Sequence, residues 1–300
     1  MRLPLASLLL PVFLTLPGCV GGDGEPEPEF QAEAPLPGHP SGGLPLEITD
    51  DFGRTLILDS LPERIISLVP SASQTLLSLG VLDRMVGRTD FDTAASLRHL
   101  PSVGGGLHPN LEAMVGLEPD LVIRFAGESD ATTPHRLDLM GIPYLTIMPN
   151  GIRDVRRIIR DLGAITGRGE SADSLLTLMD ETLAEIQTRV RNRPRPRVGY
   201  LLGGSPPWVA GPGSYIEELL EIAGGENVFS DLGGLFGPVN AEVFLSRGID
   251  LLLAAEGTEF SIPEMGVPLL RVSPAVEIPG PHLAESALEL ARALHPEVFR

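Results

Sequence analysis

Residues 63–91 read ERIISLVPSASQTLLSLGVLDRMVGRTDF, and they hold a strand, a helix and a second strand in succession. The apolar run 64–69 predicts a short buried strand, and 71–79 predicts a helix with Ser71 as its N-cap. The run 85–88 predicts the second strand. Because strands that alternate with helices usually lie parallel, this stretch favours a parallel sheet covered by helices.

The same alternation continues on both sides of this stretch. Residues 48–58 predict a β-hairpin that turns around Asp51, Phe52 and Gly53. Further strands are predicted at 121–125 and 144–148, and helices at 110–117, 131–140 and 152–165. The expected fold class is therefore α/β, with a largely parallel sheet and helices on both of its faces.

A long helix separates this region from a second alternating region. Apolar residues recur at helical spacing over 171–191, and Pro194 and Pro196 end the pattern. Beyond it, strands are predicted at 197–202, 250–254 and 268–272, and helices at 215–223, 241–246 and 283–294. We expect an N-terminal lobe at 46–167, a connecting helix at 168–193 and a C-terminal lobe at 194–300, each long enough to bury its own core.

The first residues predict export and anchoring. Arg2 precedes an apolar run over 3–16 that is too short to span a bilayer. The run ends at Leu16-Pro17-Gly18-Cys19, which resembles the lipobox of bacterial lipoproteins and implies a lipidated Cys19 after cleavage of 1–18. The alternatives are a plain signal peptide and a buried apolar helix that carries Cys19 by chance. Residues 20–45 are rich in Gly, Pro and Glu and predict a flexible tether. The expected location is extracytoplasmic, with the chain lipid-anchored to a membrane.

The composition excludes several classes of function. The chain has 40 acidic and 22 basic residues and a formal net charge of −18, which makes nucleic acid a poor partner. Cys19 is the single cysteine, so neither an intramolecular disulfide nor a multi-cysteine metal site can form. No P-loop, zincin motif or nucleophile elbow occurs, and no nucleophile has an evident base, so no catalytic residue and no cofactor is predicted.

Four stretches resemble a known family. Residues 63–91, quoted above, are one; the others are LPSVGGGLHPNLEAMVGLEPDLVIRF (100–125), PPWVAGPGSYIEELLEIAGGENVF (206–229) and GPHLAESALELARALHPEVF (280–299). Together they are similar to the substrate-binding proteins of bacterial ABC importers that serve vitamin B12, ferric siderophores and haem, with the vitamin B12 binders nearest in pattern. The resemblance implies two Rossmann-like α/β lobes joined by one long helix, with a ligand cleft between the lobes.

The resemblance also implies ligand-contacting positions. Carried over position by position, they are Pro70, Phe91, Phe125, Trp208 and Phe236, and most are aromatic side chains that would pack on a flat corrin ring. Gly106 departs from the pattern, because it stands where a vitamin B12 binder has a Trp. Packing within the protein is the alternative for each Phe. For Trp208, which the sequence places in a loop after Pro206-Pro207, ligand contact is favoured.

Two carboxylates match the positions that meet the membrane permease in this family. They are Glu112 in PNLEAM and Glu242 in VNAEVF, one in each expected lobe. The resemblance implies that they pair with Arg residues of the permease, which works with its ATPase subunits. The alternative is a first-turn Glu that favours the helix dipole on a solvated face.

The ligand class stays open among corrinoid, ferric siderophore and haem. Anionic siderophores and haem propionates favour Arg in the cleft, and Arg88 and Arg124 lie beside the aromatic positions. His108 follows three glycines and is either a turn residue or a ligand contact. No closely spaced His pair occurs among His39, His99, His108, His135, His282 and His295, so no metal site is predicted. We expect a monomer that captures a corrinoid and makes or breaks no bond; an enzyme on a similar two-lobe scaffold is the remote alternative.

Overall fold

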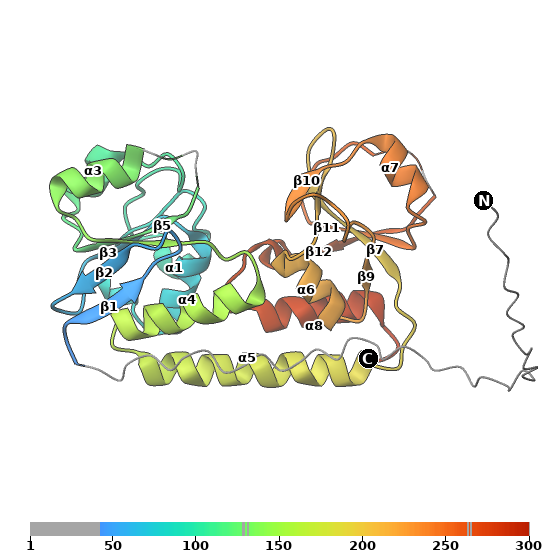
Figure 1. Cartoon of the computed structure of the whole chain (residues 1–300), viewed down its shortest axis with the longest axis horizontal. Coiled ribbons are helices and arrows are strands. Elements are labelled where there is room, and N and C mark those ends of the chain that lie inside the picture. Colours follow the sequence, from blue (N-terminus) through green and yellow to red (C-terminus); the bar gives the residue numbers. More distant parts are fainter. Residues whose placement is uncertain (1–42, 128–129, 131, 263, 265, 300) are drawn as a thin grey trace, which may run out of the picture. The chain divides into compact units, whose positions relative to one another are not determined.

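The computed structural model describes residues 43–127, 130, 132–262, 264 and 266–299 of the 300-residue chain (Figure 1). The predicted signal segment, Cys19 and most of the predicted tether lie outside the described residues. The described residues belong to one compact unit. None of the helices in this part of the chain combines the length and the apolar character of a membrane-spanning segment.

The chain enters through the predicted β-hairpin. Strands β1 (Leu46–Thr49) and β2 (Thr55–Leu58) pair antiparallel, with Leu46 opposite Leu58. Their turn is held by Asp50, whose carboxylate accepts hydrogen bonds from the backbone N–H groups of Phe52 and Arg54 at 3.0 and 2.9 Å. This Asx-type turn confirms the hairpin that the sequence predicted around Asp51.

A four-stranded sheet follows, and all its neighbouring strands are parallel. Its order is β4 (Met85–Gly87), β3 (Ile65–Ser67), β5 (Leu121–Phe125) and β6 (Tyr144–Ile147). Ile65 and Ile66 lie next to each other but join different apolar clusters, because successive side chains of a strand point to opposite faces.

Helices cover both faces of this sheet. Helices α1 (Pro70–Ser78) and α4 (Ile152–Ile165) share one apolar cluster with Ile65, and α2 (Leu111–Gly116) and α3 (Thr132–Met140) share another with Ile66. The predicted N-cap of α1 is wrong: the helix begins at Pro70, Val69 is the N-cap, and Ser71 is buried in the first turn. Pro70 accounts for the earlier start, because proline fits the first position of a helix, where no N–H partner is needed.

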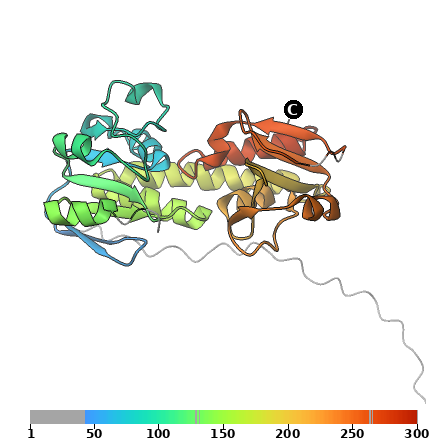
Figure 2. The ribbon, with the colours of Figure 1, turned by 90° about the horizontal axis from the view of Figure 1, so that it is seen from above.

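The long helix α5 (Gly169–Val190) has 22 residues and begins two residues before the predicted start (Figures 1 and 2). Its buried residues recur at spacings of three and four, which gives one apolar stripe: Ala172, Leu176, Met179, Leu183, Ile186 and Val190. This stripe packs against α4 and against the later helices α6 (Tyr215–Ile222) and α8 (Leu283–Leu294). A single apolar cluster therefore extends from the first sheet, along α5, to the second.

The second sheet is mixed. Its order is β10 (Phe236–Pro238), β8 (Trp208–Ala210), β7 (Arg197–Gly203), β11 (Leu251–Ala255) and β12 (Leu269–Val272), and the short β9 (Glu226–Asn227) pairs with β7. Strands β7, β11 and β12 are parallel, as predicted, whereas β8 and β10 are antiparallel. Helix α7 (Ala241–Ser246) packs on one face through Phe244, and α6 and α8 pack on the other.

The loop predicted for Trp208 is wrong, because Trp208 begins strand β8. A strand of three residues contains too little alternation to be recognised, and Pro206 and Pro207 directly before it are typical of a turn. The two-lobe α/β fold class that the sequence predicted is confirmed, and the exact lobe boundaries stay a prediction.

Candidate ligand-binding site

Three of the predicted ligand positions gather at one edge of the first sheet. Because β4, β3 and β5 are parallel neighbours, their carboxyl ends meet at this edge. Phe125 ends β5, Pro70 follows β3, and Phe91 follows β4. The side chain of Phe91 is 66% exposed and that of Phe125 is 37% exposed, although Phe is a residue that proteins usually bury. Two aromatic faces are therefore available to a ligand at this edge.

A buried polar turn holds Phe91 outward. The carboxylate of Asp92 accepts hydrogen bonds from the backbone N–H and the hydroxyl of Thr89 at 2.7 and 2.8 Å. The hydroxyl of Thr89 also accepts a hydrogen bond from the N–H of Phe91 at 3.2 Å. Asp92 and Thr89 are both buried, so this turn fixes the backbone while the Phe91 ring faces solvent.

The glycine run beside Phe91 explains the missing aromatic. A Cβ on Gly106 would lie 2.3 Å from the carbonyl oxygen of Leu68, so position 106 has no room for a side chain. A Cβ on Gly105 would instead lie 3.8 Å from the Phe91 ring, which is an ordinary contact. The loop that contains Gly105 therefore lies against Phe91.

The two arginines that the sequence left open have different surroundings. Arg124 is 3% exposed, and its Nη2 donates to the carbonyl and the carboxylate of Asp130 at 3.0 and 3.4 Å. It therefore points away from the side of β5 that exposes Phe125, as strand alternation requires. Arg88 is half-buried and donates from Nη1 to the carbonyl of Thr89 at 2.8 Å. His108 is exposed in the loop that precedes α2.

The second sheet presents the other two predicted aromatic positions. Trp208 is 48% exposed, and Phe236 is half-buried. Strand β10 pairs with β8 so that Phe236 lies opposite Ala210 and Pro238 lies opposite Trp208. Residues two apart on a strand share a face, so Trp208 and Phe236 are diagonal neighbours on one face of this ribbon.

Phe236 also touches a buried polar group that the sequence reasoning missed. Its ring packs edge-to-face on Tyr215, with centroids 6.3 Å apart. Burial raises the pKa of Tyr215, and the nearby carboxylate of Glu277 raises it further. Glu277 follows strand β12 by five residues, and its place after a strand end is the sequence signal that could have found it.

Two hydrogen bonds join the segment after β6 to helix α6. The N–H of Tyr215, which begins α6, donates to the carbonyl of Asn150 at 2.7 Å. The carboxylate of Glu218 accepts a hydrogen bond from the N–H of Ile152 at 2.6 Å, at the N-terminus of α4. A carboxylate is favourable there because a helix N-terminus carries partial positive charge. These contacts link the end of β6 to the start of α6.

Glu112 and Glu242 have closely matching surroundings. Each lies exposed in the first turn of a six-residue helix, α2 or α7. Each helix is capped by an Asn two residues earlier, Asn110 or Asn240, whose side chain accepts from a backbone N–H at 3.1 or 3.0 Å. The predicted first-turn positions are confirmed, and the permease-docking role stays a prediction.

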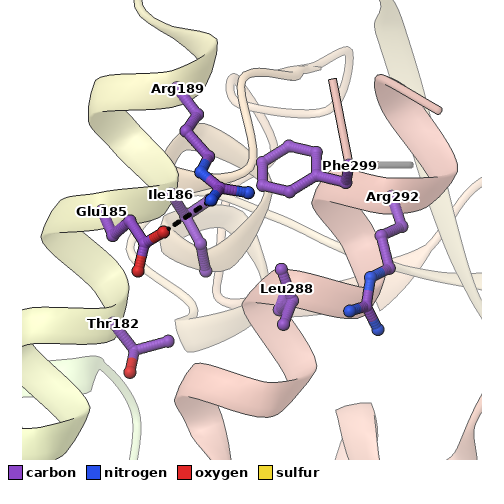
Figure 3. A pocket seen from close by; sticks show the side chains of 7 residues that line it. All are labelled: Thr182, Glu185, Ile186, Arg189, Leu288, Arg292 and Phe299. Carbon is purple, nitrogen blue, oxygen red and sulfur yellow. Dashed lines mark ion pairs between the residues drawn. The ribbon is translucent and has the colours of Figure 1, made fainter. Parts of the chain in front are cut away.

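A separate cavity of about 180 Å³ lies between α5 and α8 (Figure 3). Arg189 lies in its wall, pairs with Glu185 at 2.8 Å and places its guanidinium 5.5 Å from the Phe299 ring centroid. The complete lining is Thr182, Glu185, Ile186, Arg189, Leu288, Arg292 and Phe299, and it includes none of the predicted ligand positions. Within the described part of the chain, no three His, Cys, Asp or Glu side chains gather as metal ligands would.

Comparison with known proteins gives a family and relatives. A family model described as periplasmic binding protein matches residues 65–264. A cobalamin-binding protein of Halobacterium salinarum is 34% identical over 218 residues, which cover 70% of this chain and 58% of that protein. An ABC transporter substrate-binding lipoprotein of Bacillus subtilis is 24% identical over 276 residues, with 86% of this chain and 88% of that protein covered. The chain thus spans less than two thirds of the Halobacterium protein.

Solved structures share the fold at low sequence identity. The vitamin B12-binding protein of Vibrio cholerae superposes with a TM-score of 0.67 at 19% identity, covering 79% of this chain and 98% of that one. The haem-binding protein of Roseiflexus superposes with a TM-score of 0.66 at 21% identity, covering 79% and 99%. Both have the two-lobe α/β fold.

Proposed function

The chain belongs to the periplasmic binding protein family, and from that premise we propose that it captures a ligand outside the cytoplasm for an ABC importer. The ligand-contacting edge is the set of loops that follow the carboxyl ends of the strands, where open α/β sheets usually bind. The Bacillus relative is named as the substrate-binding lipoprotein of an ABC transporter, which supports this role. The protein binds and releases its ligand, and no bond is made or broken.

We propose a cobalamin-type corrinoid as the ligand. The observation that carries this choice is the exposure of Phe91 and Trp208, because large aromatic faces are left open at the strand ends. A broad, flat ring can cover such faces and remove them from water. The name of the Halobacterium relative supports the same ligand class.

The arginines near the strand ends are partly engaged within the protein. Arg88 and Arg124 each donate to a backbone carbonyl, and Arg271 on β12 donates to the carbonyls of Ala255 and Thr258, both at 2.9 Å. Guanidinium groups bound in this way have fewer donors left for a carboxylate or catecholate. Haem or a ferric siderophore is the alternative ligand of the same site.

We propose that Glu112 and Glu242 bind the permease. Both are exposed, and the matching Asn caps give the two helices the same local geometry. Replacing both by Arg should abolish transport in cells and leave ligand affinity unchanged. Replacing both by Gln should give a milder loss, because the charge is removed without being reversed. Lost ligand affinity in either variant would contradict the docking role.

The remaining parts of the proposal concern location and partners. We propose that the mature chain is a monomer, held at the membrane through a lipid on Cys19 and the tether 20–45. Its partners are then a permease and that permease's ATPase subunits.

Calorimetry on the purified chain with cyanocobalamin, haem and a ferric siderophore tests the ligand. Saturable heat with cyanocobalamin is the expected result. Binding of haem or the siderophore alone would keep the family role and overturn the corrinoid. Binding of none, with turnover of a small molecule that one side-chain change abolishes, would favour the enzyme alternative.

A further inference from the structure

The cavity between α5 and α8 serves none of the roles proposed above (Figure 3). Its volume is about 180 Å³, and its lining residues come from α5, from α8 and from the segment that follows α8. The predicted ligand positions, from Pro70 to Phe236, lie on other elements. A molecule bound in this cavity would therefore occupy a site separate from the ligand edge of the two sheets.

Part of the cavity lining is apolar. Ile186 of α5 is 2% exposed, and Leu288 of α8 and Phe299 are half-buried. Thr182 adds a methyl group, because its hydroxyl donates to the carbonyl of Leu178 at 2.9 Å and is thereby satisfied within α5 (Figure 3). These side chains offer a surface that an apolar group of a ligand can cover.

The rest of the lining is charged, and its positive charge exceeds its negative charge. Arg189 lies in the last turn of α5 and Arg292 in the last turn of α8. Arg189 is neutralised by Glu185, with which it pairs at 2.8 Å. Within the described residues, the guanidinium of Arg292 has no hydrogen-bond or ion-pair partner. Two arginines against one glutamate leave one net positive charge at the cavity, in a chain whose formal net charge is −18.

We propose that this cavity is a second binding site, for a small monocarboxylate that carries an apolar body. The carboxylate accepts hydrogen bonds from Arg292, whose fork of N–H donors matches two carboxylate oxygens. The apolar body covers Ile186, Leu288 and Phe299. A monoanion balances the single net positive charge, whereas a phosphate dianion would be repelled by Glu185.

The size of the cavity limits the apolar body to about one ring. A cavity of about 150 Å³ lined by Leu, Ile and Phe side chains is large enough to hold benzene. The volume of about 180 Å³ here therefore accommodates a six-membered ring with one carboxylate. Benzoate has this size, this charge and this apolar body, so it is the probe for the site.

The test titrates benzoate into the purified chain with isotope-labelled Ile and Leu methyl groups and follows their NMR signals. The methyl signals of Ile186 and Leu288 should shift saturably, with a dissociation constant on the order of 1 mM. Benzamide has the same ring without the charge and should bind about tenfold more weakly. Inorganic phosphate has no apolar body and should cause no saturable shift. No shift with benzoate, or equal binding of benzamide or phosphate, would overturn the proposal.

Two charge variants test the role of Arg292. Arg292→Gln removes the unpaired guanidinium and should weaken benzoate binding by about tenfold. Arg191→Gln is the matched control, because Arg191 is exposed at the C-cap of α5 and does not line the cavity. It removes the same charge two residues after Arg189 and should leave benzoate binding unchanged. Equal losses in the two variants would indicate a long-range effect of charge and would overturn the assigned contact.

A third variant tests the location without changing any charge. Thr182→Phe fills the cavity and should abolish the benzoate-induced shifts of Ile186 and Leu288, with a thermal midpoint that shows the variant is folded. Shifts of wild-type size in a folded Thr182→Phe variant would place benzoate elsewhere. Arg292→Gln should bind cyanocobalamin as the wild-type chain does, and a loss of that affinity would overturn the separation of the two sites.

Discussion

Replacing Gly106 by Ala should destabilise the protein, and the size of the effect follows from one close approach. The added Cβ would lie 2.3 Å from the carbonyl oxygen of Leu68, whereas real Cβ contacts essentially never fall below 3.0 Å. Leu68 cannot easily retreat, because it is 2% exposed and its N–H donates to the carbonyl of Ile123 at 2.8 Å. The loop that carries Gly106 must therefore move outward by about 0.7 Å or more.

A forced shift of this kind costs about 1–3 kcal/mol of unfolding free energy. Gly105→Ala is the matched control, because its Cβ would lie 3.8 Å from the Phe91 ring and 3.9 Å from the His108 carbonyl oxygen. Both changes reduce the freedom of the unfolded chain equally, and neither glycine has a left-handed φ. The difference between the two variants therefore isolates the contact with Leu68.

Denaturant unfolding of the wild-type chain and both variants measures this difference. Gly106→Ala should unfold at lower denaturant than Gly105→Ala, with similar slopes. It should also weaken ligand binding, because the displaced loop lies against Phe91. Equal unfolding midpoints for the two variants would refute the placement of this loop on Leu68, and with it the explanation for the missing aromatic.

Three further predictions, one of them with a comparison variant, test other contacts. Glu218→Ala should lower the unfolding free energy by about 1–3 kcal/mol, because it removes a charged acceptor from the N–H of Ile152; wild-type stability in a denaturant titration would contradict this. Asp51→Ala should lower the unfolding free energy by about 1–3 kcal/mol as well, because the Asp51 carboxylate binds Nη2 of Arg157 through both oxygens at 2.6 and 2.8 Å. Asp180→Ala removes a more exposed ion pair with Arg156, so it should lower the unfolding free energy by less than about 1 kcal/mol. Glu277→Gln should gain stability relative to the wild type as pH rises from about 4 to 7. In the wild type, the raised folded-state pKa of Glu277 stabilises the protein at pH values below the unfolded-state pKa, and this contribution is lost as pH rises through the folded-state pKa. Parallel curves of stability against pH for the two proteins would contradict the raised pKa.

Sequence reasoning predicted the regular elements well where apolar periodicity and stop signals coincide. The predicted bounds of α4, α7, α8 and β5 match the structure at both ends. Helix α4 shows why: its apolar residues recur at helical spacing, and Gly167 follows its end. Strands β8, β9 and β10 were missed because segments of two or three residues contain no recognisable period.

The candidate site was predictable only through the family resemblance, which implied its positions one by one. Pro70, Phe91 and Phe125 follow or end apolar runs, and the structure brings them to one sheet edge. The contact of Tyr215 with Asn150 and that of Glu218 with Ile152 could not be foreseen, because each joins residues about 65 positions apart. Such contacts depend on the relative packing of helices, which periodicity within one segment does not encode.

Fluorescence of Trp208 tests the central claim most directly. Trp208 is the single tryptophan of the chain and is 48% exposed at the predicted ligand edge. Titration with cyanocobalamin should quench it saturably, with the midpoint found by calorimetry, and Trp208→Phe should weaken binding by about threefold to tenfold. Heat of binding without a change in Trp208 emission would place the ligand elsewhere on the protein. Quenching by haem alone would keep the site and contradict the corrinoid.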